Sequence, residues 1–136
     1  MNVVVFIFSR IPEPSFLLLK RSEEKGGFWQ PVSGGVERNE DYIQAVKREI
    51  AEETGITDIL NIVDLKMSYE YEATKNNVRM KMKDVCFGAE VIQTASVNLS
   101  DEHSNYKWCN REEVYTYLNW ENIRLPFEQL IHSIEN

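Results

Sequence analysis

Three glutamates, Glu49, Glu52 and Glu53, stand at relative positions i, i+3 and i+4 in the chain. On an α-helix these spacings place the side chains on one face, with neighbouring Cβ atoms about 5–6 Å apart. Carboxylates held that close repel one another, so helix stability alone gives no reason to collect them. A hard divalent cation gives a reason, because Mg²⁺ and Mn²⁺ prefer carboxylate and water oxygens as ligands. The spacing therefore predicts a rigid row of metal-binding carboxylates at the surface of a helix.

Metal-binding carboxylates suit the hydrolysis of a diphosphate. Attack at phosphorus is opposed by the negative charge of the phosphoryl oxygens, which divalent cations neutralise while they orient the phosphates and lower the pKa of a bound water. The reaction also needs a group that accepts a proton. The three glutamates can supply both functions within one helical turn. The alternative interpretation is a solvated amphipathic helix whose exposed face is rich in glutamate.

The residues around the glutamates extend the pattern over the segment 34–56, which reads GGVERNEDYIQAVKREIAEETGI. This segment resembles the Nudix box: a glycine, five residues, Glu, seven residues, then Arg-Glu-aliphatic-x-Glu-Glu-x-Gly-aliphatic. Every required position is filled, by Gly34, Glu40, Arg48, Glu49, Ile50, Glu52, Glu53, Gly55 and Ile56. From average residue usage, a chance match has a probability on the order of 10⁻⁸ per chain. The chain is therefore identified as similar to the Nudix hydrolases.

The resemblance implies roles for the box residues. Glu49 and Glu53 would be the principal metal ligands, and Glu52 would be a further ligand or the general base. Arg48 lies four residues before Glu52 and could orient the glutamates through charge-assisted hydrogen bonds. Glu40 either pairs with Arg48 or complements the helix dipole. The cofactor implied by this set of ligands is Mg²⁺ or Mn²⁺.

Further metal ligands are expected outside the helix. Family members use the backbone carbonyl just before the box glycine, which here belongs to Ser33. The Glu-His-x-x-Tyr-x-Trp pattern from Glu102 to Trp108 resembles the segment that supplies a late glutamate ligand in some Nudix subgroups. Glu102 is the expected ligand and Asp101 the second choice, while the alternative is a solvated loop ahead of a strand. His103 alone is a weak signal, since a lone histidine is more often structural than a ligand.

The expected substrate contacts lie before and within the glycine-rich segment. Lys20 and Arg21 end a strand, where they could meet phosphates or simply be solvated. Trp29 could stack on a heterocycle or pack in the core. A glycine pair permits close approach of the backbone to a ligand. The expected substrate-binding residues are Lys20, Arg21, Trp29, Gln30, Gly34 and Gly35.

Segments that flank the box narrow the expected substrate. Residues 28–30, 32–34, 102–108 and 120–122 resemble the dihydroneopterin triphosphate pyrophosphatases, also described as dATP pyrophosphohydrolases. This implies that a (d)NTP or dihydroneopterin triphosphate is cleaved to a monophosphate and pyrophosphate. A dinucleoside polyphosphate (Ap4A-type) is the second choice, because its hydrolases share the Trp-Gln and Glu-His features, and a nucleotide sugar or capped RNA end is the third. A non-catalytic nucleotide-binding Nudix module is disfavoured, since such modules typically lose box glutamates.

The rest of the chain must position this site. The glutamate-bearing helix is expected over 40–54, with Asn39 as N-cap and Gly55 as the terminating glycine. Its core face would carry Ile43, Val46 and Ile50. Strands are expected at 2–8, 15–21, 56–63, 66–73, 78–83, 85–94 and 105–110, with a short extended piece at 28–32 and a hairpin turn at Asn76-Asn77. Closing helices are expected at 112–118 and 123–134, the second packing through Leu125, Leu130, Ile131 and Ile134.

The order of elements is mixed α/β, and the resemblance implies the Nudix α/β/α sandwich around a mixed β-sheet. A length of 136 residues suits a single domain, 1–136, with a substantial core. A net charge of −7 argues against a broad surface for a nucleic acid duplex, so the expected partner is a small nucleotide or pterin polyphosphate bound through metal. The opening apolar run is too short for a signal peptide and no stretch approaches about 20 apolar residues, so no membrane partner and a cytoplasmic location are expected.

Overall fold

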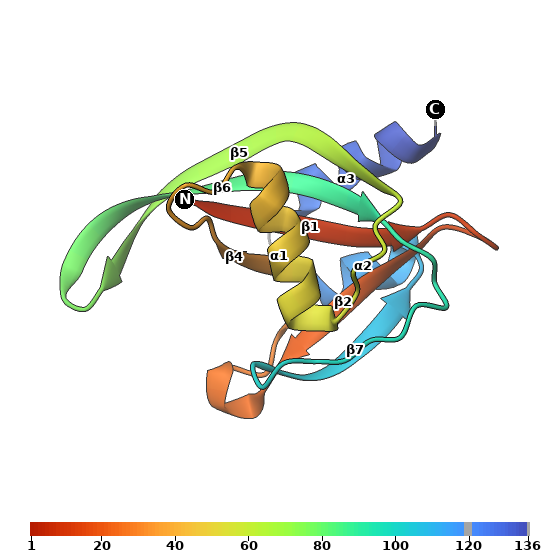
Figure 1. Cartoon of the computed structure of the whole chain (residues 1–136), viewed down its shortest axis with the longest axis horizontal. Helices are drawn as coiled ribbons and strands as arrows, with labels where there is room; N and C mark the ends of the chain where they lie inside the picture. The colour runs from red at the N-terminus through yellow and green to blue at the C-terminus, as the bar shows by residue number, and fades with distance from the viewer. Residues whose placement is uncertain (119–120, 136) are drawn as a thin grey trace.

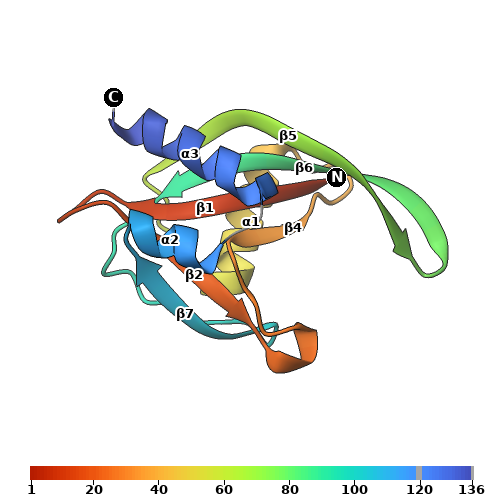
Figure 2. The ribbon, with the colours of Figure 1, turned by 180° about the vertical axis from the view of Figure 1, so that it is seen from behind.

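The chain folds as a mixed β-sheet between two helical layers. A computed structural model describes residues 1–118 and 121–135, and the side chains of all of these except 121 and 122. Its elements are β1 (Asn2–Ser9), β2 (Ser15–Arg21), a 3₁₀ helix η1 (Glu23–Lys25), β3 (Trp29–Gln30), β4 (Val32–Gly35), α1 (Tyr42–Thr54), β5 (Asn61–Lys75), β6 (Val78–Glu90), β7 (His103–Cys109), α2 (Arg111–Tyr117) and α3 (Glu121–Glu135). Helix α1 crosses one face of the sheet, and α2 and α3 lie on the other (Figures 1 and 2). The predicted α/β/α sandwich is confirmed.

Strands β1 and β2 run side by side only near the loop that joins them. Their antiparallel pairing is confined to Ile7–Ser9 and Ser15–Leu17. Further along, the two strands separate: β1 pairs with β4 through residues 2–5, and β2 pairs with β3. Residues 29–35 therefore fill an opening in the sheet. The glycine-rich segment meets α1 at this opening (Figure 1).

The other side of β1 carries the long hairpin of β5 and β6. Strand β6 runs parallel to β1, with Asn2 opposite Asp84, and β5 pairs antiparallel with β6 at the edge. The hairpin turns at Asn76 and Asn77, which have φ values of 53° and 64° as a tight two-residue turn requires. The predicted hairpin is confirmed, and its far end projects beyond the sandwich (Figures 1 and 2).

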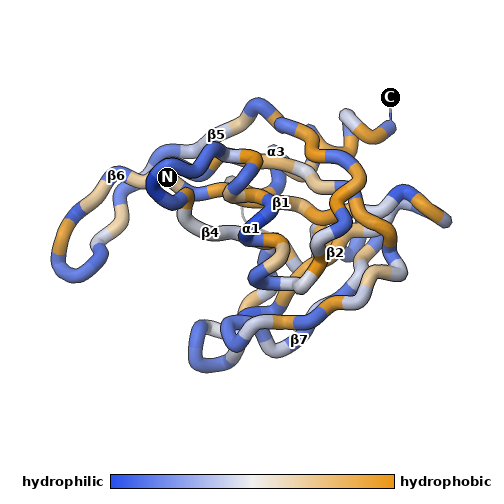
Figure 3. Tube along the Cα trace, viewed as in Figure 1, coloured by the Kyte–Doolittle hydropathy of each residue, from blue (hydrophilic) through white to orange (hydrophobic). Residues whose placement is uncertain are grey.

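Two apolar cores lie on opposite faces of the sheet, because β1 is apolar at successive positions and buried on both faces. Val3, Val5 and Ile7 pack on the α1 side, and Val4, Phe6 and Phe8 pack on the α2 and α3 side. The sheet interior is correspondingly hydrophobic, whereas the outer end of the hairpin is mixed (Figure 3).

Two pairs of predicted strands are each a single strand in the structure. The predicted strands 56–63 and 66–73 are one strand, β5, which begins only at Asn61. A bulge between Asp64 and Ser68 interrupts its pairing, with Lys66 at φ 55° and its N–H donating to Asp64 Oδ1 at 2.8 Å. The predicted strands 78–83 and 85–94 are likewise one strand, β6, which ends at Glu90. Strand β7 and helices α2 and α3 begin one or two residues earlier than expected, as element ends often do.

Helix α1 begins two residues later than predicted, because Asp41 caps it in place of Asn39. Asp41 Oδ1 accepts from the Gln44 N–H at 2.8 Å, and Gln44 Oε1 accepts from the Asp41 N–H at 2.9 Å. Asn39 has φ 66° and lies in the preceding turn. Gly55 ends the helix with φ 74°, as predicted.

Two apolar residues predicted to pack are instead exposed. Ile43 of α1 is 41% exposed, and Ala45 takes its expected place in the core beside Val46 and Ile50. Leu125 of α3 is 50% exposed, whereas Leu130 and Ile131 are buried as expected. Within residues 1–118 and 121–135, no helix is long and apolar enough to cross a membrane.

Candidate active site

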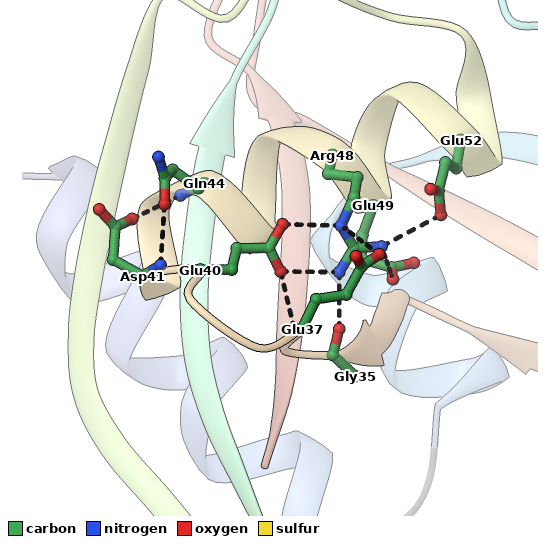
Figure 4. Close-up of polar contacts among 8 residues, drawn as sticks. All are labelled: Gly35, Glu37, Glu40, Asp41, Gln44, Arg48, Glu49 and Glu52. Carbon is green, nitrogen blue, oxygen red and sulfur yellow. Dashed lines mark hydrogen bonds and ion pairs between the residues drawn. The ribbon is translucent and has the colours of Figure 1, made fainter.

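Arg48 of α1 organises the acidic residues around it (Figure 4). Its Nε and Nη2 donate to the two carboxylate oxygens of Glu40, at 2.8 and 2.9 Å. Its Nη1 donates to Glu49 Oε1 at 2.7 Å and to Glu52 Oε2 at 3.2 Å. Its Nη2 also donates to the Gly35 carbonyl at 2.7 Å. The guanidinium therefore ties the start of the box, the helix and the end of β4 together.

The Arg48–Glu40 pair resolves an alternative that the sequence left open. The two hydrogen bonds from Arg48, together with the Glu37 backbone, lower the pKa of Glu40 to about 2. Glu40 in turn raises the pKa of Arg48 further above its ordinary value. Both groups therefore stay charged at neutral pH, and Glu40 serves as the partner of Arg48 as expected for a box residue.

Two of the three glutamates turn inward. Glu49 and Glu53 are only 8% and 4% exposed, whereas the Glu52 side chain is 55% exposed. The prediction of a surface row of carboxylates is therefore wrong for Glu49 and Glu53, because the rest of the fold covers their face of α1. Glu52 alone remains at the surface, where it faces Arg48 (Figure 4).

Glu53 is a buried carboxyl group without a hydrogen-bond partner. Among the described residues, neither of its carboxylate oxygens has one. Burial raises the pKa of Glu53 to about 9, and the adjacent carboxylates of Glu49 and Glu102 raise it in the same direction. The Ser33 backbone lowers the pKa of Glu53, but by less than burial and the two carboxylates raise it. Such a group ionises at neutral pH only when a cation compensates its charge.

Gly34 allows Glu49 to occupy its position. A Cβ built on Gly34 would overlap the carboxylate carbon and both oxygens of Glu49. A Cβ on Gly35 would meet only Asn2 Oδ1, at an ordinary 3.7 Å. Gly34 is therefore required for close packing of β4 on α1, whereas its neighbour Gly35 could carry a side chain.

These donors fit a hard divalent cation. Across residues 1–118 and 121–135, no three His, Cys, Asp or Glu side chains form a ready-made metal cluster. Glu49 and Glu53 are nonetheless two adjacent carboxylates, and one of them lacks partners for both oxygens. Glu102 and the Ser33 backbone are both close enough to Glu53 to change its pKa. Oxygen donors of this kind, with an unmet need for positive charge, are what Mg²⁺ and Mn²⁺ bind.

A cavity of about 560 Å³ lies next to this group, because Ser33 and Glu102, which both act on Glu53, are part of its wall. Glu49, Glu52 and Glu53 themselves are not among its described lining residues. Five predicted site residues line it: Arg21, Gln30, Ser33, Gly34 and Glu102. The remaining described lining residues were not predicted, and they are Asn2, Val4, Pro31, Tyr71, Asp84 and Ile123. The cavity therefore joins the glycine-rich segment to β1, β6 and α3.

Three predicted substrate contacts lie away from the cavity wall. Lys20 pairs with Glu23 at 3.6 Å. Trp29 packs in the core against Tyr117, with ring centroids 5.2 Å apart, which is the packing alternative. Gly35 contributes its carbonyl to Arg48. Of the late segment 120–122, Trp120 and the side chains of the other two residues lie outside what the structure describes.

Arg21 is the basic residue of the cavity. Its guanidinium lies 5.6 Å from the centre of the Phe28 ring. Its Nε is buried and, within the described chain, has no hydrogen-bond partner. A guanidinium donor with unmet hydrogen-bonding capacity beside a cavity suits a phosphate, which arginine binds in a bidentate manner.

His103 lies beside Glu53 and Gln30, although a lone histidine is a weak signal in the sequence. Its side chain is fully buried, with Nε2 2.9 Å from Gln30 Nε2 and 3.7 Å from Glu53 Oε1. Burial lowers the pKa of His103, and the Arg21 charge lowers it further. The imidazole is therefore neutral at pH 7 and connects Gln30 to the buried glutamate. Its position directly after the expected ligand Glu102 is the sequence feature that could have identified it.

Comparison with known proteins decides the family. The NUDIX domain model matches residues 1–130. The chain belongs to the Nudix family. The predicted resemblance is thereby confirmed over almost the whole chain.

Curated relatives of this Nudix chain carry several different names. An octanoyltransferase of Myxococcus xanthus is 32% identical over 97% of this chain, but the chain spans only 34% of that protein's length. An RNA pyrophosphohydrolase of Pelagibacter ubique is 30% identical over 70% of this chain and 67% of its own length. A bis(5'-nucleosyl)-tetraphosphatase of Caenorhabditis elegans is 39% identical over 72% of this chain and 69% of its own length. With the Nudix domain, the relatives from Pelagibacter ubique and Caenorhabditis elegans indicate a hydrolase of pyrophosphate linkages.

Solved structures show the same Nudix fold. A Listeria monocytogenes protein described as a NUDIX hydrolase superposes with a TM-score of 0.85 at 25% identity, covering 100% of this chain and 94% of that one. The E. coli dihydroneopterin triphosphate pyrophosphohydrolase superposes with a TM-score of 0.78 at 23% identity, covering 97% and 94%. At that identity the second likeness concerns the fold alone.

Proposed function

We propose that this Nudix protein is a Mg²⁺- or Mn²⁺-dependent pyrophosphohydrolase of a small triphosphate, a (d)NTP or dihydroneopterin triphosphate, which it cleaves to a monophosphate and pyrophosphate. The observation that carries the proposal is the position of Glu53. This carboxyl group is buried, its oxygens have no hydrogen-bond partner among the described residues, and it lies beside Glu49 and next to a cavity whose wall includes Arg21. Neither a structural helix nor a solvated acidic face requires such a group.

The residues of the site have different roles in the proposed reaction. Arg21 binds phosphate oxygens through its guanidinium. Glu49 and Glu53, with Glu102 and the Ser33 carbonyl, would hold the divalent cation, which supplies charge neutralisation and a more acidic water when bound. Arg48 is a positioning residue, since it holds Glu49 and the Gly35 carbonyl in place.

The group that accepts the proton is one of the box glutamates. Glu52 is exposed at the surface of α1 and accepts a hydrogen bond from Arg48, and it is the first candidate base. Glu53 is nearer the cavity residues Ser33 and Glu102, and it can accept a proton once a cation has lowered its pKa. A comparison of the pH–rate profiles of the Glu52→Gln and Glu53→Gln variants distinguishes the two.

A dinucleoside polyphosphate is the second candidate. It is favoured by the relative from Caenorhabditis elegans, whose name describes a bis(5'-nucleosyl)-tetraphosphatase. Pockets for small ligands commonly measure roughly 300–1,000 Å³. The cavity of about 560 Å³ suits one heterocycle with its phosphates, so a second nucleoside would extend beyond it. The size of the cavity therefore favours the triphosphate as the first candidate.

The proposal is tested by hydrolysis in ¹⁸O-labelled water with Mg²⁺, followed by mass spectrometry of the products. The substrates are the (d)NTPs, dihydroneopterin triphosphate and Ap4A. We expect a monophosphate and pyrophosphate from a triphosphate, with the label showing which phosphorus is attacked. Glu53→Gln should abolish most turnover, whereas the exposed Glu24→Gln should not. Binding of intact nucleotides without cleavage of any of them would favour a sensor module instead.

A further inference from the structure

Three polar side chains that the proposed chemistry does not use gather in the cavity wall. Asp84 Oδ1 accepts hydrogen bonds from Asn2 Nδ2 at 3.1 Å and from the Tyr71 hydroxyl at 3.0 Å. Asn2 Nδ2 also lies 3.3 Å from the Tyr71 hydroxyl oxygen. These residues come from β1, β5 and β6, and all three line the cavity. We refer to Asn2, Tyr71 and Asp84 as the carboxylate triad.

The carboxylate triad lies at the opposite end of the cavity from Arg21. Strand β4 forms one wall, with Asn2 opposite its last residue, Gly35, and Asp84 opposite Asn2 on β6. Arg21 lies at the other end, near the β2–β3 pairing that includes Gln30. From residue 30 to residue 35 an extended chain spans at most roughly 16–18 Å. This length suits a heterocycle at the triad and its phosphates at Arg21.

The cavity wall also contains apolar side chains, which Val4, Pro31 and Ile123 contribute. Apolar walls receive the faces of a planar ring, while a few polar groups fix its edge. The cavity thus combines apolar walls with Arg21 and Glu102 near one end and an anionic end formed by Asp84.

The anionic end is unexpected in a site for an anionic substrate. An ionised aspartate only accepts hydrogen bonds, and both donors that Asp84 has here are neutral groups. Both of these bonds go to Oδ1. Burial and then the adjoining Asp84 carboxylate raise the pKa of Tyr71, so its hydroxyl stays protonated and keeps donating. A ligand edge that meets this end must therefore present donors, and two adjacent donors match the two oxygens of a carboxylate.

We propose that the carboxylate triad selects a substrate whose heterocycle has a 2-amino-4-oxopyrimidine edge, with Asp84 accepting from the ring N–H and the exocyclic amino group. Guanine and pterins share this edge. Adenine and cytosine present one amino donor beside an acceptor, and uracil and thymine present one N–H between two acceptors. The inference rests on the proposed function and narrows its substrate class. Asp84 is thus a specificity-determining residue.

The experiment compares kcat/KM for dGTP, dITP, dATP and dihydroneopterin triphosphate with Mg²⁺. Inosine keeps the ring N–H of guanine but lacks the 2-amino group. A hydrogen bond to a charged group is worth enough that dGTP should exceed dITP by about 10-fold or more. dATP should fall with dITP or below it. The ratio of kcat/KM for dGTP to that for dihydroneopterin triphosphate shows whether the cavity prefers guanine or the pterin.

Variants test whether the Asp84 carboxylate causes the preference for dGTP over dITP. In Asp84→Asn the dGTP-to-dITP ratio should fall to within about threefold, because one acceptor oxygen becomes a donor. Tyr71→Phe, which keeps the ring and removes one donor to Asp84, should reduce the same ratio less. Asp58→Asn, at an exposed aspartate outside the cavity, is the matched control and should keep it. Thermal melting of each variant separates loss of folding from loss of selectivity.

The two proposals fail in different ways. Equal or better hydrolysis of dATP, or an unchanged ratio in folded Asp84→Asn, overturns the inference and leaves the pyrophosphohydrolase standing. If no triphosphate is hydrolysed, the proposed function falls, and equilibrium binding of GMP, IMP and AMP tests the triad by itself. Tighter binding of GMP then supports the inference, and equal binding of the three overturns it.

Discussion

The carboxylate of Glu49 packs directly against the backbone of Gly34, at the place that a side chain on any other residue would occupy. Arg48 secures the same carboxylate from its other side with a hydrogen bond of 2.7 Å. The glycine and the arginine of the box therefore act on one glutamate. Together they fix the distance between β4 and α1, and with it the position of Glu53 one turn further along the helix.

Replacement of Gly34 by alanine should displace the Glu49 carboxylate. A misplacement of about 1 Å at a reacting site can lower the rate about 10²-fold, and we expect a loss of kcat/KM of that order. Gly35→Ala is the matched control, because its Cβ would make only ordinary contact. Steady-state hydrolysis with Mg²⁺ measures both. Comparable activity in the two variants would contradict the packing described for Glu49.

Arg48→Lys should weaken metal binding without removing a ligand. Lysine keeps the positive charge but loses the planar set of donors that reaches Glu40, Glu49 and Gly35 at once. Groups that orient metal ligands typically contribute 10- to 100-fold to affinity, and we expect a loss in that range. Titration with Mn²⁺ measures it. Arg38→Lys, at an exposed arginine four residues into the box, is the control and should bind normally.

The sequence predicted the box helix well because its signals are local. The terminating glycine and the spacing of Glu49 and Glu53 act within one helix, and α1 ends at Thr54 as expected. The cap was assigned to Asn39, whereas Asp41 takes that place with Gln44 as its reciprocal partner. Asparagine also tolerates positive φ, and the preceding turn uses that property.

Burial of the glutamates could not be predicted, because it depends on contacts between distant segments. Strand β4 covers α1 only because β1 and β2 separate and residues 29–35 fill the opening. The same arrangement brings His103 to Gln30, 73 residues away in the chain. It also brings Asn2 to Asp84, which no local pattern connects. Sequence patterns therefore locate the helix and five residues of the cavity wall, but not Asn2, Tyr71 and Asp84, which β1, β5 and β6 add to it.

Arg21 and Lys20 should differ in their effect on substrate binding, although they are neighbours. Arg21 lines the cavity with a buried Nε that lacks a described partner, whereas Lys20 pairs with Glu23 away from the cavity wall. A hydrogen bond between charged groups is worth enough that Arg21→Ala should raise KM about 10-fold or more. Lys20→Ala should change KM by less than about threefold, as exposed ion pairs contribute little. Equal effects on KM would refute this assignment of the phosphate-binding residue.

Glu53 should make the stability of the metal-free protein fall as pH rises. Its pKa is about 9 in the folded chain, against an ordinary value of 4.5 that applies once the chain unfolds. Between these values the folded state holds a proton that the unfolded state has released. The free energy of unfolding therefore decreases with pH across this window. Below pH 4.5 both states are protonated and Glu53 contributes no slope.

Glu53→Gln should remove this contribution, because an amide keeps the shape of the carboxyl group and does not ionise. Because folding of the wild type at pH 8 requires Glu53 to take up a proton, the metal-free variant should be more stable by about 1–3 kcal/mol at pH 8, with little change at pH 5. Urea unfolding in the presence of a chelator, at both pH values, measures the difference. Glu52→Gln, one residue earlier with a 55% exposed side chain, should keep the wild-type slope. Addition of Mg²⁺ at pH 8 should then stabilise the wild type but not Glu53→Gln, since only an ionised carboxylate gains from the cation. If the variant is no more stable than the wild type at pH 8, burial does not raise the pKa of Glu53 in the metal-free protein.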